Sequence, residues 1–159
     1  MEVYSIKKRG RAGMTLVELI VAFTILSLLA SMAVPLARYK VKRDKERDLR
    51  WALHDIHQAI DKYKDMADRG ELGPQKLGSE NYPETLEILV QGAKKAGAVD
   101  TKVKFLRRIP KDPITNSYDW GKRSMQDDTT STSWGGQNVF DVYTKSRDKA
   151  SDGTNYTDW

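Results

Sequence analysis

A single carboxylate, Glu18, lies within an otherwise uncharged apolar segment near the start of the chain. The segment covers residues 14–37, and Glu18 is the one formal charge among its 24 residues. A carboxylate inside a membrane span is costly, so it suggests a functional group that pairs with a cation at similar depth. Two simpler interpretations remain open: the side chain reaches the membrane interface, or the acid is protonated.

The apolar segment is long enough to cross a bilayer. At 1.5 Å per residue, its 24 residues would form roughly 36 Å of helix. A basic stretch at residues 7–11 precedes it and leads into the small residues Ala12 and Gly13. A secretory signal has its small-residue cleavage site after the apolar run, whereas here the small residues come first. Cleavage after Gly13 would therefore leave the membrane helix on the mature protein.

The residues around Glu18 resemble a known processing site. Residues 13–18, Gly-Met-Thr-Leu-Val-Glu, are similar to the cleavage site of type IV prepilins and of the pseudopilins of type II secretion. The resemblance implies that a prepilin peptidase cuts between Gly13 and Met14 and methylates the new N-terminus at Met14. Pro35 stands where these proteins commonly carry a helix-kinking proline, and the resemblance implies that it takes part in assembly. The chain departs from the family pattern at Met14, because the first mature residue is usually Phe.

The same resemblance gives Glu18 a partner and an assembly role. As the fifth mature residue, its carboxylate would pair with the Met14 amine of a neighbouring subunit. Pairing would neutralise both charges as subunits leave the bilayer and pack into a filament. We therefore expect a Glu18→Ala variant to be cleaved and inserted but to assemble poorly.

Composition limits the possible functions. The 159 residues leave room for one domain beyond the membrane helix. The chain has no Cys, so neither a disulfide nor thiol chemistry is available. The formal net charge is +5, but residues 1–13 hold four basic residues and one acidic residue, so the processed chain keeps +2. The basic balance is thus a weak argument for a nucleic-acid partner, which the sequence disfavours.

The charges that flank the apolar segment point to conflicting topologies. The leader at residues 1–13 has four basic residues, and residues 38–50 have seven. The positive-inside rule alone would place the C-terminal part in the cytoplasm. The family resemblance instead predicts a single-pass protein of the bacterial inner membrane with its C-terminal part in the periplasm. We follow the resemblance because the cleavage-site pattern is the more specific signal.

Apolar residues continue at helical spacing after Pro35, within residues 38–70. They are Leu49, Leu53, Ile56, Ile60, Tyr63 and Ala67. Spacings of three and four residues place them on one face of an amphipathic helix, and Gly70 provides a C-terminal stop. The sequence therefore predicts one helix over about residues 14–69, roughly 84 Å long. Its first half would be buried all round, and its second half would be packed on one side by a domain.

Residues 71–159 are predicted to form a small globular α/β part that begins with a short second helix. Residues 82–90 predict this helix, with Pro83 in its first turn and acidic residues near its N-terminus. Gly92, or at the latest Gly97, would end it.

The remaining elements are a rigid turn, a variable loop and strands. Residues 109–118 contain two prolines three apart, which precludes helix and predicts a turn into a strand around residues 118–120. Residues 121–138 are polar and predict a variable loop. Residues 139–143, Val-Phe-Asp-Val-Tyr, predict a strand. The stretch with the two prolines, like the start of the second helix, resembles the corresponding part of the major pseudopilins.

In the pseudopilins that this chain resembles, the last strand is followed by a calcium-binding loop. Calcium takes six to eight oxygen ligands, largely carboxylates and carbonyls. The resemblance therefore predicts calcium as a cofactor, held by Asp148, Asp152 and Asp158. Three cations in the same segment oppose a dication. The alternative is a polar C-terminal tail held by packing of Tyr156 and Trp159.

No other pattern suggests chemistry. His54, His57 and Asp61 have a spacing that could hold a metal, although two His on a charged helix are usually surface residues. The chain has no H-E-x-x-H, P-loop, G-x-S-x-G or dinucleotide motif. The sequence therefore predicts no enzyme.

Together the patterns predict an α+β protein in which a long N-terminal helix packs against a short helix and a small antiparallel sheet of about three strands. The resemblance implies that this is a type IV pilin-like fold. The resemblance implies a structural subunit of a periplasmic pseudopilus that drives export of folded proteins by type II secretion. The implied partners are other copies in a helical filament, the prepilin peptidase, minor pseudopilins and an inner-membrane assembly platform with a separate ATPase. The subunit would be membrane-inserted before assembly.

The alternative is a type IV pilin or minor pilin of a surface filament, for adhesion, motility or DNA uptake. DNA uptake would require exposed Lys and Arg residues with aromatic neighbours. Arg107-Arg108 and Lys122-Arg123 are the candidates.

Overall fold

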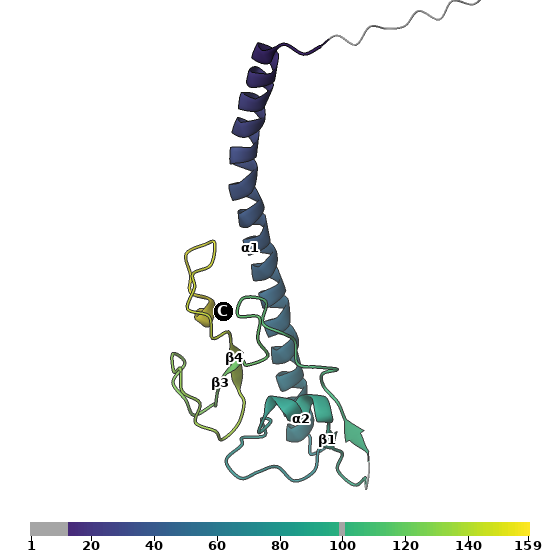
Figure 1. The fold of residues 1–159 in the computed structure, drawn as a ribbon. Coiled ribbons are helices and arrows are strands. Elements are labelled where there is room, and N and C mark those ends of the chain that lie inside the picture. The colour runs from purple at the N-terminus through teal and green to yellow at the C-terminus, as the bar shows by residue number, and fades with distance from the viewer. Residues whose placement is uncertain (1–12, 99–100) are drawn as a thin grey trace, which may run out of the picture. The chain divides into compact units, whose positions relative to one another are not determined.

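The computed structural model describes residues 13–98 and 101–159 (Figure 1). The chain divides into two compact units, and the boundary between them, at Lys40 and Val41, falls inside the first helix. Of the predicted leader, Gly13 alone lies within the described residues.

The first helix, α1 (Leu16–Asp68), is continuous over 53 residues. Thr15 caps its start, since its Oγ1 accepts a hydrogen bond of 3.3 Å from the backbone N–H of Glu18. Pro35 lies inside the helix without ending it. The chain leaves α1 through Gly70, whose φ of +69° suits glycine. The single long helix and its glycine stop are both confirmed.

The two parts of α1 differ in burial. Every residue from 13 to 43 is exposed. Within the described part of the chain, α1 is the one helix that is long and apolar enough to cross a membrane. The predicted apolar stripe of its second part is buried throughout: Leu49, Leu53, Ile56, Ile60, Tyr63 and Ala67. The hydrophobic pattern thus predicted the buried face correctly.

The second helix, α2 (Leu86–Gln91), is shorter than predicted and begins later. The prediction that Pro83 lies in its first turn is wrong. The Pro83 carbonyl accepts a 2.7 Å hydrogen bond from the N–H of Val139, and this long-range contact holds the residue in the preceding loop. The helix ends at Gly92, as predicted, where φ is +92°.

The strands form two separate antiparallel pairs. Strand β1 (Ala93–Lys94) pairs with β2 (Lys102–Val103), and β3 (Gly121–Arg123) pairs with β4 (Asp141–Tyr143). The α+β class is confirmed, but the arrangement predicted for the strands, about three in one sheet, is wrong. Figure 1 shows β3 and β4 side by side, and α2 close to β1.

The strand predicted around residues 118–120 lies three residues later, at the start of the predicted loop. Trp120 is buried, and its Nε1 donates to the Pro110 carbonyl at 2.9 Å, so it anchors the turn instead of pairing in a sheet. A Cβ on Gly121 would lie 2.4 Å from the Tyr143 ring, so the strand needs glycine there. The variable loop therefore begins after Arg123.

One hydrophobic core holds the second unit together. Residues of the α1 stripe pack with Leu86 and Leu89 of α2 and with Trp120, Val142 and Tyr156 from the C-terminal half. Burial of these apolar side chains is the main force that stabilises the unit. The core fixes residues 71–159 against the second part of α1.

Candidate functional site

The predicted cleavage site lies on accessible chain. Gly13, Met14 and Thr15 are exposed and precede the first helical residue. Among the described residues, no atom beyond the chain neighbours lies within 4 Å of the position that a Cβ on Gly13 would take. The bond between Gly13 and Met14 is therefore open to an enzyme on its C-terminal side. The residues before Gly13 lie outside the described part.

Glu18 lies in the first turn of α1, surrounded by exposed apolar residues. The partial positive charge of the helix N-terminus favours an acid at this place. Within residues 13–98 and 101–159, no ion pair or hydrogen bond reaches its carboxylate. The carboxylate is thus available to a group on another molecule, as an assembly role requires.

Pro35 occupies the middle of the exposed apolar part of α1. Because proline has no N–H, the carbonyl four residues earlier, at Ser31, loses its usual helical donor. The helix continues through this position, and the assembly role predicted for Pro35 stays a prediction.

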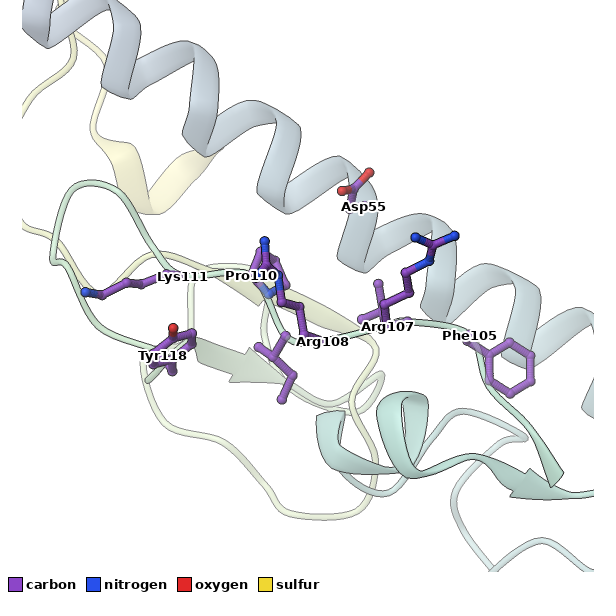
Figure 2. Close-up of a pocket in the computed structure, with 9 residues that line it drawn as sticks. Asp55, Phe105, Arg107, Arg108, Pro110, Lys111 and Tyr118 are labelled. Atoms are coloured by element: carbon purple, nitrogen blue, oxygen red, sulfur yellow. The ribbon is translucent and has the colours of Figure 1, made fainter.

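A basic pocket of about 550 Å³ lies between α1 and the segment that follows β2 (Figure 2). Asp55 of α1 lies on one side, and Arg107, Arg108 and Lys111 lie on the other. Both arginines are exposed, and within the described residues neither has an ion-pair partner. The Lys111 Nζ lies 5.9 Å from the ring centroid of Tyr118, itself 66% exposed. Of the two basic pairs predicted from the sequence, Arg107-Arg108 is therefore free to meet an anionic partner.

The other basic pair is used inside the fold. The Lys122 Nζ lies 4.1 Å from the centroid of the Trp134 ring. The Arg123 guanidinium stacks 4.0 Å from the Tyr143 ring centroid and donates to Asp141 at 2.9 Å. These contacts stabilise the hairpin of β3 and β4, so the pair is a poor candidate for nucleic acid.

The three residues predicted to bind calcium do not come together. The Asp152 Oδ1 accepts hydrogen bonds from the backbone and side chain of Thr154, and these bonds hold the pKa of the Asp152 carboxyl below its usual value. The Asp158 carboxylate accepts from Asn155 at 3.0 Å. Within the described residues, no three His, Cys, Asp or Glu side chains form a metal-type group. The donor set therefore does not fit calcium.

His54, His57 and Asp61 likewise do not form a cluster. The His54 ring bonds with the Gln58 amide at 2.9 Å, whereas His57 Nε2 lies 2.9 Å from Asp141 Oδ1. The two histidines have separate structural partners.

Comparison with known proteins identifies the family. The model of the Prokaryotic N-terminal methylation motif matches residues 8–34. Type II secretion system core protein G of Aeromonas hydrophila is 32% identical over 123 residues, which cover 70% of this chain and 73% of that protein. The core protein G of Escherichia coli (strain K12) is 34% identical over 115 residues, which cover 67% and 68%. The chain belongs to the family of type II secretion system core protein G. No solved structure matches it significantly.

For this core protein G family member, the processing motif and the apolar helix support single-pass membrane anchoring. The similarity extends well beyond the matched N-terminal motif, because the aligned residues amount to about two thirds of the chain. It therefore includes globular sequence after residue 70.

The Pro-Lys-Asp-Pro stretch of this family member acts as a rigid turn. Asp112 is fully buried, and its Oδ1 accepts from the N–H of Ile114 at 2.8 Å. Its Oδ2 accepts from the hydroxyls of Thr115 and Thr144. Asp112 thus ties the turn to the residue that follows β4. Both carboxylate oxygens of Asp112 are thus engaged within the protein, and they hold the turn that the two prolines predict.

A second polar network was missed by the sequence reasoning. Asp141 lies between His57 of α1 and Arg123 of β3, at 2.9 Å from each. Burial raises the pKa of the Asp141 carboxyl, but the hydrogen bonds from His57 and Arg123 outweigh it and lower the pKa overall. The available signal was Asp141 itself, an acid in the middle of a predicted strand, residues 139–143, that is otherwise apolar.

Proposed function

We propose that this protein is the structural subunit of a periplasmic pseudopilus that drives export of folded proteins by type II secretion. The leader would be removed between Gly13 and Met14, and the Met14 amine would be methylated. The subunit would wait in the inner membrane, with its C-terminal part in the periplasm, until it is drawn into a helical filament.

The similarity to two core protein G chains over about two thirds of this chain carries the proposal. A shared N-terminal motif alone would fit any pilin-like protein, but similarity that reaches into the globular part favours the secretion branch. The exposed apolar surface of residues 16–37 supports a helix that passes from lipid into contacts with other copies.

Glu18 supplies the charge that would guide assembly. Its carboxylate has no partner within the described part of the chain, and an unpaired carboxylate in an apolar environment is unfavourable. The methylated amine of Met14 on a neighbouring copy would neutralise it. Repetition of this contact between different surfaces gives an open helical array, because a heterologous interface does not close.

The proposal assigns no catalytic step to this chain. A prepilin peptidase would process it, minor pseudopilins would accompany it, and an assembly platform with a separate ATPase would supply the energy.

Filament yield tests the subunit role. The full chain is produced with its own secretion machinery, and filaments are sheared or extracted and measured by immunoblot. We expect Gly13→Val to block processing, and Glu18→Ala to be processed and inserted but to give few filaments. The matched control is Thr24→Ala, because the Thr24 hydroxyl bonds within α1 to the Val21 carbonyl at 2.8 Å. Full filament yield from Glu18→Ala would contradict the assembly role.

Membrane orientation needs its own test, because the flanking charges and the family resemblance disagree. An alkaline phosphatase reporter joined after Trp159 is active only in the periplasm. We expect activity in this fusion. An inactive phosphatase, with activity from a cytoplasmic reporter at the same place, would reverse the topology.

A further inference from the structure

A carboxylate on α1 holds the C-terminal segment, residues 149–159. The Glu46 Oε1 accepts hydrogen bonds from the Ser151 backbone N–H at 2.7 Å, the Ser151 Oγ at 2.8 Å and the Tyr156 hydroxyl at 2.9 Å. Three donors on one ionised oxygen form a strong set, because hydrogen bonds to charged groups contribute more than neutral ones. These contacts join parts of the chain that are more than a hundred residues apart in sequence.

Two cations flank Glu46 along the same side of α1. Lys42 and Arg50 lie four residues before and after it, a spacing that makes them neighbours on a helix surface. The Lys42 Nζ donates to the Lys149 carbonyl at 2.8 Å. The Arg50 guanidinium lies 3.9 Å over the centre of the Trp159 ring and 3.7 Å from the Asp152 carboxylate. Lys42 thus contacts the first residue of the segment, and Arg50 contacts the last.

The segment also closes on itself. The Ala150 N–H donates to the Thr154 carbonyl at 2.8 Å, and the Gly153 N–H donates to the Ala150 carbonyl at 3.1 Å. The Trp159 Nε1 donates to the Thr154 Oγ1 at 2.8 Å. Tyr156 is buried in the core. The turn therefore has internal partners for its polar groups and an apolar anchor.

These contacts occupy oxygens that a calcium ion would need. The Lys149 carbonyl is bonded to an ammonium group, and the Asp152 carboxylate is shared between Thr154 and Arg50. A divalent cation would meet repulsion from Lys42 and Arg50, and it would need several free oxygens at once. The cations around this segment therefore disfavour a bound metal ion. The side chains of α1 already hold residues 149–159 in place.

We propose that Lys42, Glu46 and Arg50 form a calcium-independent clasp that orders residues 149–159. The side chains of α1 provide the charges that a divalent cation would otherwise provide in this segment. This inference does not depend on the role of the protein in secretion.

Hydrogen exchange followed by mass spectrometry tests the clasp in the full chain in detergent micelles. Peptides that cover residues 149–159 are compared in millimolar calcium chloride and in excess EGTA. We expect the same exchange in both, within about twofold. Slower exchange or a higher melting temperature in calcium would overturn the proposal.

Variants of the clasp provide the second readout. Glu46→Gln should speed exchange of the segment by about tenfold, because it weakens hydrogen bonds to a charged acceptor. The matched control is Asp48→Asn on the same helix, because Asp48 is exposed and, among the described residues, forms an ion pair with Arg47 alone, at 3.7 Å. It should leave the segment unchanged. Unchanged exchange in Glu46→Gln would also overturn the proposal.

Peptides from residues 49–67 report whether a variant still folds. If Glu46→Gln also speeds exchange in residues 49–67, the variant has disturbed the core, and Ser151→Ala becomes the test of the clasp. Ser151→Ala removes the hydroxyl that donates to Glu46 and leaves the core side chains unchanged. We expect Ser151→Ala to speed exchange of residues 149–159 by about threefold, with residues 49–67 protected. An effect no larger than that of Asp48→Asn would contradict the clasp.

Discussion

The two parts of α1 are continuous as helix but are built for different surroundings. Residues 16–37, apart from Glu18, are uncharged and largely apolar on every side, and all of them are exposed. From Leu49 to Ala67, apolar residues occupy one stripe, and that stripe is buried by residues 72–159. The first part packs against no other described residues of its own chain, whereas the second part contributes one side of the hydrophobic core.

The difference shows that the period of the apolar residues, and not helix formation itself, decides what each part contacts. A helix that is apolar all round requires lipid or other copies, and a striped helix requires a domain. The two parts should therefore respond to mutation in opposite ways: the second through folding, and the first through insertion and assembly.

The largest contrast is expected from one matched pair of isoleucines. Ile56 is fully buried, so Ile56→Ala should lower the free energy of unfolding by about 2–5 kcal/mol. Ile25 is 53% exposed, and Ile25→Ala should change it by less than about 0.5 kcal/mol. Denaturant unfolding of the full chain in micelles, followed by tryptophan fluorescence, measures both. Equal losses would erase the distinction between the two parts.

Removing a polar contact of the second part of α1 should lower the free energy of unfolding by less than Ile56→Ala does. Asp141→Asn removes the ion pair with Arg123, which is 11% exposed, and weakens the bond to His57. We expect a loss of about 2 kcal/mol, because a hydrogen bond to a charged group is lost at a partly buried site. The same unfolding measurement applies. No loss would mean that the stripe alone supports the fold.

Asp141 also predicts a pH dependence. The pKa of its carboxyl is lowered in the folded state from an ordinary value of 3.8, since burial raises it but His57 and Arg123 lower it more. The group therefore stabilises the fold fully above that ordinary value, and the contribution is lost as pH falls through the lowered pKa. Melting curves between neutral pH and about pH 3 should show a flatter acid decline in Asp141→Asn than in the wild type. Parallel curves would contradict this role.

The smallest effect on stability is expected at the basic pocket. Arg107 and Arg108 are exposed, so changing both to Ala should alter the free energy of unfolding by less than about 0.5 kcal/mol. The double variant also tests DNA uptake in an electrophoretic mobility assay at low and high salt. Its matched control changes Lys94 and Lys95, an exposed basic pair elsewhere, to Ala. We expect no salt-sensitive binding; binding that is lost in the arginine variant alone would favour a DNA-uptake pilin.

The sequence predicted the features that depend on local periodicity. The extent of α1, its buried face and its glycine stop follow from spacing and from Gly70. The loop position of Pro83 depends on a hydrogen bond from Val139, and the position of β3 depends on the contact of Gly121 with Tyr143. Such long-range contacts leave no periodic signal in the sequence.

The residues of the candidate site also divide into those that the sequence could predict and those that it could not. The processing residues and Glu18 could be identified because they are contiguous in sequence and resemble a family pattern. The prediction of calcium came from the family alone, and the carboxylates of two of the three residues it named, Asp152 and Asp158, have other partners in the structure. The contact of Glu46 with Ser151 could not be predicted, because no local pattern relates an acid on a helix to a loop so far along the chain.

The most direct test of the central claim is quantitative mass spectrometry of the culture medium and the periplasm, with the gene present, deleted and restored. A secretion subunit predicts that a set of folded proteins disappears from the medium, accumulates in the periplasm and returns on restoration. An unchanged set of secreted proteins, with loss of this chain alone from sheared surface material, would contradict the account and indicate a surface pilin.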